Sequence, residues 1–208
     1  MTSGAFPFEA NPNPVDAADR AARLVDPGFG RVFTDHMVTI RYSDAKGWHD
    51  AKVGPRAPLT LDPATAVLHY AQEIFEGLKA YRLADGSMAL FRPEQNARRF
   101  QRSAKRLAMP ELPEDMFLQA CKQLVQVDKD WFPPVDGGSI YLRPFMIASE
   151  VFLGVKPSAE YLFMVIASSA GNSFKSGAPA ISIWVSEQYT RAARGGTGAA
   201  KCGGNYAA

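Results

Sequence analysis

Cysteine and long apolar runs are both scarce in this chain. Only two cysteines occur, Cys121 and Cys202, and they form no C-x-x-C pair, so we expect no disulfide framework and no metal site. No stretch approaches the roughly 18 apolar residues of a membrane span. The first 14 residues lack the basic and apolar regions of a signal peptide. We therefore expect a soluble, cytoplasmic protein without a membrane partner.

A surplus of charge of one sign is also missing. The chain has 23 basic and 21 acidic residues, a net charge of +2, which gives no electrostatic reason to expect nucleic acid as a partner. What is present is ordinary globular usage, with 47% apolar and 21% charged residues. At 208 residues the chain is long enough for one large or two small domains with a buried core.

The periodicity of apolar residues predicts an α/β (α+β) fold. Helices are predicted near 94–108 and 114–130, with a short helix near 65–71. Six segments have the pattern of strands: 32–42, 74–83, 88–91, 139–148, 161–167 and 180–186. Residues 1–30, rich in Pro, Gly, Asn and Asp, are predicted to form an irregular arm. Small residues at 168–177 indicate a linker after a first domain.

The segment around Lys201 is the most unusual one. Glycines and alanines flank this lysine on both sides, so the backbone can pass close to a ligand. A lysine among small neighbours can approach a planar ring, although a flexible, solvated loop is the plainer interpretation. A phosphate-binding P-loop is excluded because Ala200 and Cys202 stand where its glycine and hydroxyl residue are required.

Two arginine positions remain open on pattern alone. Alternation along 139–148 places Arg143 on one face with Tyr141 and other apolar residues, where it needs either an ion-pair partner or a ligand anion. Pro144 removes a backbone donor, which favours an edge strand or a bulge. On the helix near 94–108, Arg98 and Arg99 flank the apolar stripe symmetrically, so the spacing does not say which of them binds an anion.

Taken together, these segments resemble the branched-chain amino acid aminotransferases, in the fold-type IV group of pyridoxal phosphate enzymes. Six stretches carry the resemblance, in the family's order and over nearly the whole chain: 32–37 (VFTDHM), 68–81 (LHYAQEIFEGLKAY), 90–100 (LFRPEQNARRF), 141–144 (YLRP), 153–155 (LGV) and 195–206 (GGTGAAKCGGNY). The resemblance implies a small α/β domain over 1–170, an interdomain linker over 171–179, and the start of a C-terminal cofactor-binding domain over 180–208.

The resemblance also implies roles for individual residues. Lys201 is similar to the lysine that binds pyridoxal 5'-phosphate covalently, Arg99 to the arginine that binds its phosphate, and Tyr206 to the tyrosine facing its phenolic oxygen. Four residues match substrate-pocket positions: Phe29, Phe75, Tyr141 and Arg143. Three match residues that family homodimers contribute across the subunit interface: Tyr70, Leu153 and Val155.

The implied reaction is transamination between branched-chain L-amino acids and 2-oxoglutarate, giving branched-chain 2-oxo acids and glutamate. Arg143 would suit the side-chain carboxylate of glutamate. Ser173 stands where the family often has a tyrosine, which affects the expected substrate preference. We identify no acidic partner for the cofactor's pyridine nitrogen, so we expect residues 1–208 alone to be inactive. The alternatives are a D-amino acid aminotransferase, an aminodeoxychorismate lyase, or a non-catalytic dimerisation module.

Overall fold

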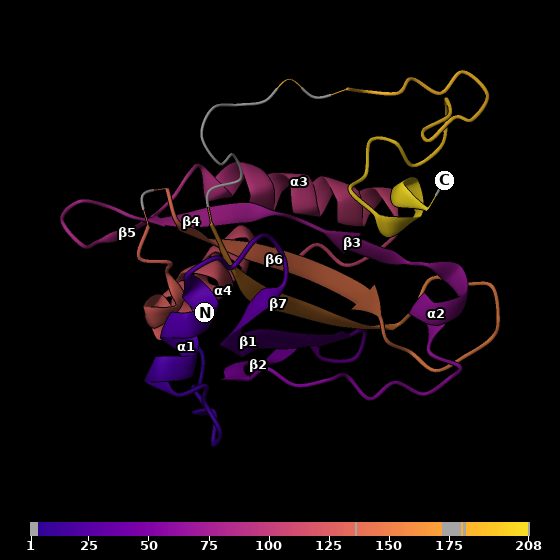
Figure 1. The fold of residues 1–208 in the computed structure, drawn as a ribbon. Coiled ribbons are helices and arrows are strands. Elements are labelled where there is room, and N and C mark those ends of the chain that lie inside the picture. The colour runs from indigo at the N-terminus through magenta and orange to yellow at the C-terminus, as the bar shows by residue number, and fades with distance from the viewer. Residues whose placement is uncertain (1–3, 136, 172–179, 181, 208) are drawn as a thin grey trace.

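The structure, a computed structural model, is built around one curled antiparallel sheet (Figure 1). It describes residues 4–135, 137–171, 180 and 182–207. The strands are β1 (Val32–Ser43), β2 (Gly47–Pro55), β3 (Glu73–Phe75), β4 (Leu78–Arg82), β5 (Met88–Leu90), β6 (Ser139–Ala148) and β7 (Glu160–Ala170). They lie in the order β2-β1-β7-β6-β4-β5, and β3 also pairs with β6.

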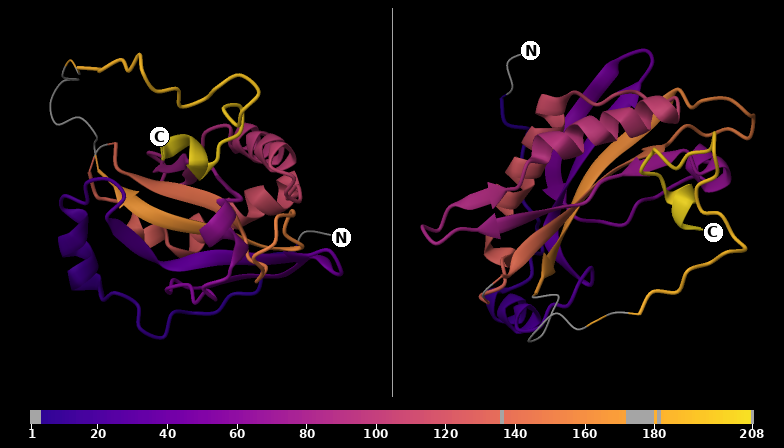
Figure 2. Two further views of the ribbon diagram at one scale, coloured as in Figure 1. Left: turned by 90° about the vertical axis from the view of Figure 1, so that its right-hand side faces the viewer. Right: turned by 90° about the horizontal axis from the view of Figure 1, so that it is seen from above.

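Two long helices cover one face of this sheet (Figure 2). The helices are α1 (Ala17–Leu24), α2 (Ala66–Tyr70), α3 (Pro93–Arg106) and α4 (Glu114–Val127), with short 3-10 turns η1 (Lys129–Trp131) and η2 (Gly203–Tyr206). Phe100 of α3, Phe117 of α4 and Phe163 of β7 meet with ring centroids 5.5 to 6.2 Å apart. All three are fully buried, so the three-and-four spacing read from the sequence does mark the core face of each helix.

Most of the predicted elements are confirmed. Strand β6 has the predicted limits, and α2, α3, α4 and β1 differ from the predictions by a few residues. The strands predicted at 74–83 and 88–91 meet in a hairpin of β4 and β5, whose turn contains Gly86 at φ +80°. The predicted strand at 74–83 is divided into β3 and β4, which keep one register against β6 on both sides of the break.

The prediction that Pro144 marks an edge strand or a bulge is wrong. Strand β6 is internal, with β7 on one side and β3 and β4 on the other, and its register is regular throughout. Pro144 is tolerated because it lies opposite the break at Glu76 and Gly77. There the Glu76 N–H donates to the Pro144 carbonyl at 2.7 Å, and the break needs no hydrogen bond from the Pro144 nitrogen, which carries no hydrogen.

Three further predictions need correction. Residues 1–30 are not wholly irregular, because they contain α1, whose first turn is capped by the Asp16 side chain. Strand β2 was not predicted. Residues 182–186 form no strand, although their apolar pattern suggests one. Trp184 is 84% exposed, and none of the strands in the described part of the chain pairs with this segment. The linker proposed at 171–179 lies, apart from Gly171, outside the described residues, as does Ser173.

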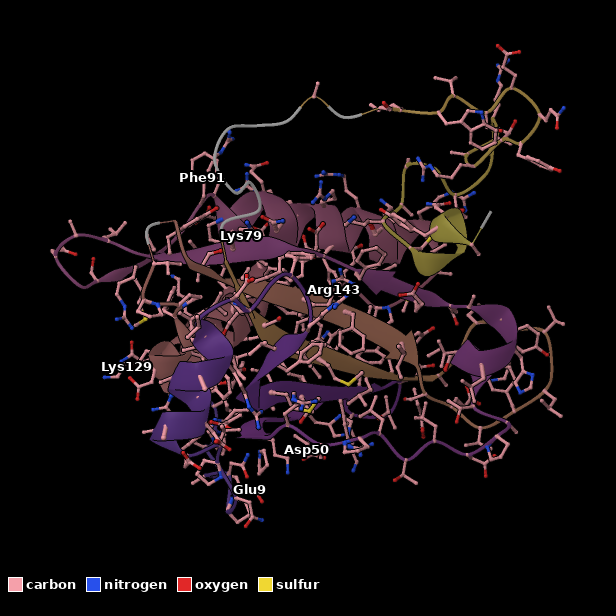
Figure 3. All side chains as sticks on the ribbon, viewed as in Figure 1. Glu9, Asp50, Lys79, Phe91, Lys129 and Arg143 are labelled. Atoms are coloured by element: carbon pink, nitrogen blue, oxygen red, sulfur yellow. The ribbon has the colours of Figure 1, made fainter. Side chains whose placement is uncertain are left out.

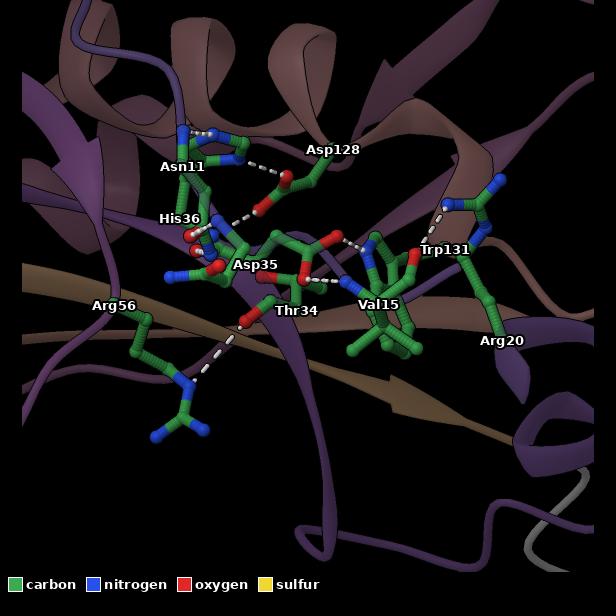
Figure 4. Close-up of polar contacts among 10 residues, drawn as sticks. Asn11, Val15, Arg20, Thr34, Asp35, His36, Arg56, Asp128 and Trp131 are labelled. Carbon is green, nitrogen blue, oxygen red and sulfur yellow. Dashed lines mark hydrogen bonds and ion pairs between the residues drawn. The ribbon is translucent and has the colours of Figure 1, made fainter. Parts of the chain in front are cut away.

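The N-terminal arm, residues 4–31, is fixed to the sheet through His36 (Figure 4). His36 Nε2 accepts the Asn11 backbone N–H at 3.1 Å, so the ring proton lies on Nδ1. Nδ1 donates to Asp128 at 2.7 Å, and the same carboxylate accepts the His36 backbone N–H at 3.1 Å. Asp128 is 3% exposed, so this contact is a buried one that links β1 to the end of α4.

A second buried carboxylate continues this anchor. Asp35 accepts the Val15 backbone N–H at 3.0 Å with one oxygen and the Trp131 indole N–H at 2.9 Å with the other. The Asp35 carbonyl accepts from the Asn11 amide at 3.0 Å. Both ends of the stretch from Asn11 to Val15 are therefore held by Asp35 and His36 of β1. This stretch leads directly into α1, and the arm then continues to Phe29.

Candidate active site

The loop that carries Lys201 is anchored to both α3 and β3. The Lys201 backbone N–H donates to the buried Ser103 hydroxyl at 2.9 Å, and the Lys201 carbonyl accepts the Phe75 N–H at 3.0 Å. Gly203 N–H donates to the Glu73 carboxylate, and a Cβ on Gly203 would collide with that carboxylate. Lys201 is thus held between two contacts, although residues 182–196 are exposed.

Asn205 closes the same loop from inside. This buried side chain donates to the carbonyls of Thr197 at 2.9 Å and Ala200 at 2.8 Å, and accepts the Thr197 hydroxyl at 2.8 Å. Arg106, at the end of α3, donates to the carbonyls of Gly195 and Gly196. The glycine-rich segment is therefore an ordered loop at this end, which argues against the flexible-loop interpretation of the sequence.

Aromatic rings surround the Lys201 amine. Nζ lies 4.4 Å from the centre of the Phe75 ring and donates a hydrogen bond to the Tyr206 hydroxyl at 2.9 Å. The rings of Phe75 and Tyr206 are themselves 5.3 Å apart. Amines are attracted to aromatic faces, so these two rings favour one position of the lysine side chain. The amine and hydroxyl stand together at the surface of the loop.

Arg143 also contacts Phe75, and it lies over the middle of the sheet (Figure 3). Its guanidinium carbon is 4.7 Å from the centre of the Phe75 ring, and its Nη2 donates to the Tyr141 hydroxyl at 3.0 Å. Within the described residues Arg143 has no ion-pair partner, so a ligand anion remains open to it. Tyr141 itself packs against Gly77, where a Cβ would collide with its hydroxyl.

A pocket of about 170 Å³ opens beside this arginine. Phe29 from the N-terminal arm lies edge-on to Tyr141, with ring centres 4.9 Å apart. The lining is mostly apolar: Phe29, Gly30, Phe33, Tyr141, Arg143, Ile166, Ala167 and Ser168. The structure therefore brings together the four residues assigned to a substrate pocket, with Phe75 reaching it through Arg143. Such a pocket accepts an apolar group beside an anion.

The two candidate arginines of α3 have different partners. Arg98 forms an exposed ion pair with Glu114 at 3.4 Å. Arg99 forms a two-pronged ion pair with the fully buried Glu76, at 2.5 and 2.7 Å. Hydrogen bonds from Arg99 to Glu76 raise the pKa of Arg99, and Tyr206 adds a smaller electrostatic effect. Arg99 is therefore the arginine on the Lys201 side, which the helical spacing alone did not decide.

The remaining three predicted residues lie elsewhere. Tyr70, Leu153 and Val155 are exposed, and none of them lines the pocket beside Arg143. Tyr70 donates its hydroxyl proton to the Leu153 carbonyl at 2.5 Å, which joins α2 to the loop between β6 and β7. This chain by itself does not bring these residues to the pocket.

Sequence reasoning missed Glu73, Glu76, Gly77 and Ser103. Ser103 follows Arg99 by one helical turn, so a shared face of α3 was a usable signal. The others lie in or beside β3, where nothing in the local sequence shows their partners. Among the described residues, no three His, Cys, Asp or Glu side chains are grouped to hold a metal ion, and no helix is long and apolar enough to cross a membrane.

The donor set fits one class of cofactor. A lysine amine, a tyrosine hydroxyl and an arginine guanidinium lie around Phe75 and its neighbour Glu76, and they match an aldehyde, a phenolic oxygen and a phosphate respectively. Those three groups occur together on a phosphorylated hydroxyaryl aldehyde.

The curated proteins most similar in sequence that we compared carry the same family name. No protein-family model matches the chain. It is 60% identical over 209 residues to a probable branched-chain-amino-acid aminotransferase of Streptomyces coelicolor, which aligns 100% of this chain with 58% of that protein. It is 57% identical to the enzyme of Mycolicibacterium smegmatis, again over 100% of this chain and 57% of the relative. The chain thus spans a little over half the length of these curated relatives.

Solved structures agree in fold. The branched-chain amino acid aminotransferase of Escherichia coli matches 83% of this chain and 50% of its own at a TM-score of 0.53 and 23% identity, which shows the fold alone. A second bacterial-type structure, the T.th. branched-chain amino acid aminotransferase complexed with 4-methylvaleric acid, matches 80% of this chain and 50% of its own, at a TM-score of 0.53 and 26% identity. These matches confirm the predicted α/β fold.

Proposed function

Residues 1–208 correspond along their whole length to the N-terminal part of the branched-chain aminotransferases, and from this premise we propose that the protein transfers amino groups between leucine, isoleucine or valine and 2-oxoglutarate. The observation that carries this proposal is the placement of Lys201 and Arg143 on one ring. Phe75 lies 4.4 Å from the amine and 4.7 Å from the guanidinium carbon. An amine and an anion-binding group that contact the same ring suit an amino acid and a 2-oxo acid.

We propose pyridoxal 5'-phosphate as the cofactor, held by Lys201, Tyr206 and Arg99. When bound, this group supplies an aldehyde that condenses with amines and a ring that accepts electrons from the substrate. The solved T.th. relative with pyridoxamine 5'-phosphate supports the choice, at 25% identity and a TM-score of 0.53. Arg99 would bind the phosphate through charge-assisted hydrogen bonds, and Tyr206 would hold the phenolic oxygen.

In this proposal Lys201 is the catalytic residue. With the cofactor bound, the Lys201 amine would be the group that accepts and returns a proton at the substrate Cα. The Tyr206 hydroxyl, 2.9 Å from Nζ, keeps the amine within reach of that proton. The Phe75 ring would cover one side of the amine, 4.4 Å from its centre.

The pocket beside Arg143 is proposed to accept both substrates. Phe29 and Tyr141 offer apolar contact to a branched side chain. Arg143, without an ion pair in the described part of the chain, would bind the side-chain carboxylate of glutamate or 2-oxoglutarate. The Tyr141 hydroxyl bonded to Arg143 keeps the guanidinium at the margin of the pocket when an aliphatic substrate is present.

Three wider assignments belong to the same proposal. Tyr70, Leu153 and Val155 would complete the substrate site of a partner subunit in a cytoplasmic homodimer; their exposure at 41%, 64% and 94% supports this. Residues 1–170 would form the small domain, because the sheet ends at Ala170. Residues 180–208 would begin the cofactor-binding domain, joined by the linker at 171–179.

The test uses the full natural protein loaded with pyridoxal phosphate. Borohydride reduction followed by peptide mapping should place the pyridoxyl group on Lys201, and a label on Lys79 instead would refute the assignment. Activity with leucine and 2-oxoglutarate should exceed that with D-alanine or aminodeoxychorismate. The reverse order would favour the alternative fold-type IV enzymes, and no turnover with any of them would favour the non-catalytic module.

A further inference from the structure

We propose that Glu76 is a positioning residue whose buried carboxylate holds one edge of the Arg99 guanidinium and so presents the opposite edge to the phosphate of the cofactor. This inference rests on the proposed function, because it assumes that Arg99 binds that phosphate. No motif in the sequence assigned a role to Glu76, and its place in the fold provides the argument.

Four donors converge on the Glu76 carboxylate. Arg99 Nε and Nη2 lie 2.5 and 2.7 Å away, Asn96 Nδ2 lies 2.8 Å away, and the Gly77 backbone N–H donates at 3.2 Å. The side chain is fully buried. A carboxylate removed from water and surrounded by donors is fixed in orientation, so whatever it binds is fixed as well.

The geometry leaves part of Arg99 available. A guanidinium has five N–H groups, and Glu76 takes one from Nε and one from Nη2. Nη1 and the second Nη2 hydrogen have no other partner in the described chain, and the Arg99 side chain remains 47% exposed. The Glu76 carboxylate is buried, whereas the Arg99 guanidinium is accessible. This arrangement is expected when the arginine also binds an anion from outside the protein.

The break between β3 and β4 places this anchor beside the site. Phe75 faces Lys201 and Arg143, while Glu76, the next residue, is buried against Arg99 and Asn96 of α3. Tyr206 lies close enough to Arg99 to affect its pKa electrostatically. One short stretch of backbone therefore sets the positions of the ring beneath Lys201 and of the arginine beside Tyr206.

The neighbouring pair provides a matched control. Arg98 and Glu114 join α3 to α4 at the surface, with a distance of 3.4 Å and both side chains well exposed. Exposed pairs of this kind contribute little. Removing the Glu114 charge changes the same kind of ion pair one residue away along the helix, without touching Glu76, Arg99 or the Lys201 loop.

The experiment compares two ligands in the full natural protein. Pyridoxal phosphate and pyridoxal carry the same aldehyde and ring, but only the first has a phosphate. In Glu76→Gln, the amide NH₂ would face an Arg99 donor in either orientation, because Arg99 Nε bonds to one carboxylate oxygen and Nη2 to the other, so Arg99 loses its fixed orientation. We expect affinity for pyridoxal phosphate to fall roughly tenfold or more, by loss of a charge-assisted contact, and affinity for pyridoxal to change less than about twofold. The ³¹P resonance of the bound phosphate should shift.

Glu114→Gln should leave both affinities and the ³¹P signal unchanged. Equal losses for the two ligands in Glu76→Gln would overturn the proposal, because they would indicate a general structural role. If Glu76→Gln does not fold, Glu76→Asp decides: it keeps the charge but withdraws the carboxylate, and it should again weaken only the phosphorylated ligand. A wild-type protein that binds neither ligand would instead reject the proposed function.

Discussion

The N-terminal arm and the C-terminal segment, residues 182–207, are both poor in regular structure, yet they are held very differently. The arm is attached at intervals: Phe6 to Gln123, Glu9 to Val53, and Asn11 to His36. The C-terminal segment runs outside the sheet in every view and, in the described chain, bonds to the domain only from Gly195 onward (Figures 1 and 2). Apolar content does not explain this difference.

The difference lies in where the polar partners are buried. Asp35 and His36 lie under the arm with their donors and acceptors matched, so removing the arm would leave buried polar atoms of both without their Val15 and Asn11 partners. The stretch before Lys201 exposes Ile183, Trp184 and Val185 and has no such partners in the described chain. An irregular segment is ordered where buried polar groups of the domain require it as their hydrogen-bond partner. Four substitutions test this explanation.

The largest effect is expected from Asp128→Ala. The substitution leaves His36 Nδ1 and the His36 backbone N–H without their acceptor in a buried place, which should lower the free energy of unfolding by about 2–4 kcal/mol. Urea unfolding measures it. Asp130→Ala, which removes an exposed carboxylate two residues away, is the control. Similar losses for both would show that the buried contact does not hold the arm.

Arg106→Ala should have a smaller and more local effect. It removes two hydrogen bonds to the carbonyls of Gly195 and Gly196 from an exposed side chain, so we expect about 1 kcal/mol or less. Cleavage by trypsin after Arg194 should become faster. Arg102→Ala, an exposed arginine of α3 with no hydrogen bond in the described chain, should leave the rate at Arg194 unchanged.

Glu73 makes the anchor of the C-terminal segment depend on pH. Burial raises the pKa of Glu73 above 4.5, against smaller lowering effects from Gly203 and Arg143. A carboxyl group whose folded pKa is raised contributes stability below its unfolded pKa, and this is lost as the pH rises through the folded value. We expect a slight fall in the unfolding midpoint just above pH 4.5, which Glu73→Gln should flatten. An unchanged slope in the variant would contradict the assignment.

The smallest effect is expected at Trp184. Its side chain is 84% exposed, so Trp184→Ser in the 208-residue chain should change the free energy of unfolding by less than about 0.5 kcal/mol. Denaturant titration is sufficient to measure this. A loss above about 1.5 kcal/mol, the range of a buried aromatic, would mean that the segment is covered in solution.

The same contrast explains what sequence could predict. The spacing of Ala97, Phe100 and Ala104 predicts α3 because helical periodicity is a local pattern. The alternation along β6 is equally local, and it predicts both ends of that strand. The strand prediction for the apolar run at 182–186 is wrong because a strand also needs a neighbouring strand, which no local pattern supplies. In the site, glycines marked Lys201, whereas Glu76 was missed and Arg98 and Arg99 looked equivalent. Their roles depend on partners about 16 to 23 residues away.

Phe75 has one more consequence, which concerns both charged groups of the site. Lys201 Nζ and the Arg143 guanidinium carbon lie 4.4 and 4.7 Å from the centre of a single ring. Both groups therefore rest on one rigid side chain that has only two torsions. Phe75 thus couples the lysine of the C-terminal segment to the arginine of β6, and a change of this one side chain alters the surroundings of both groups at once.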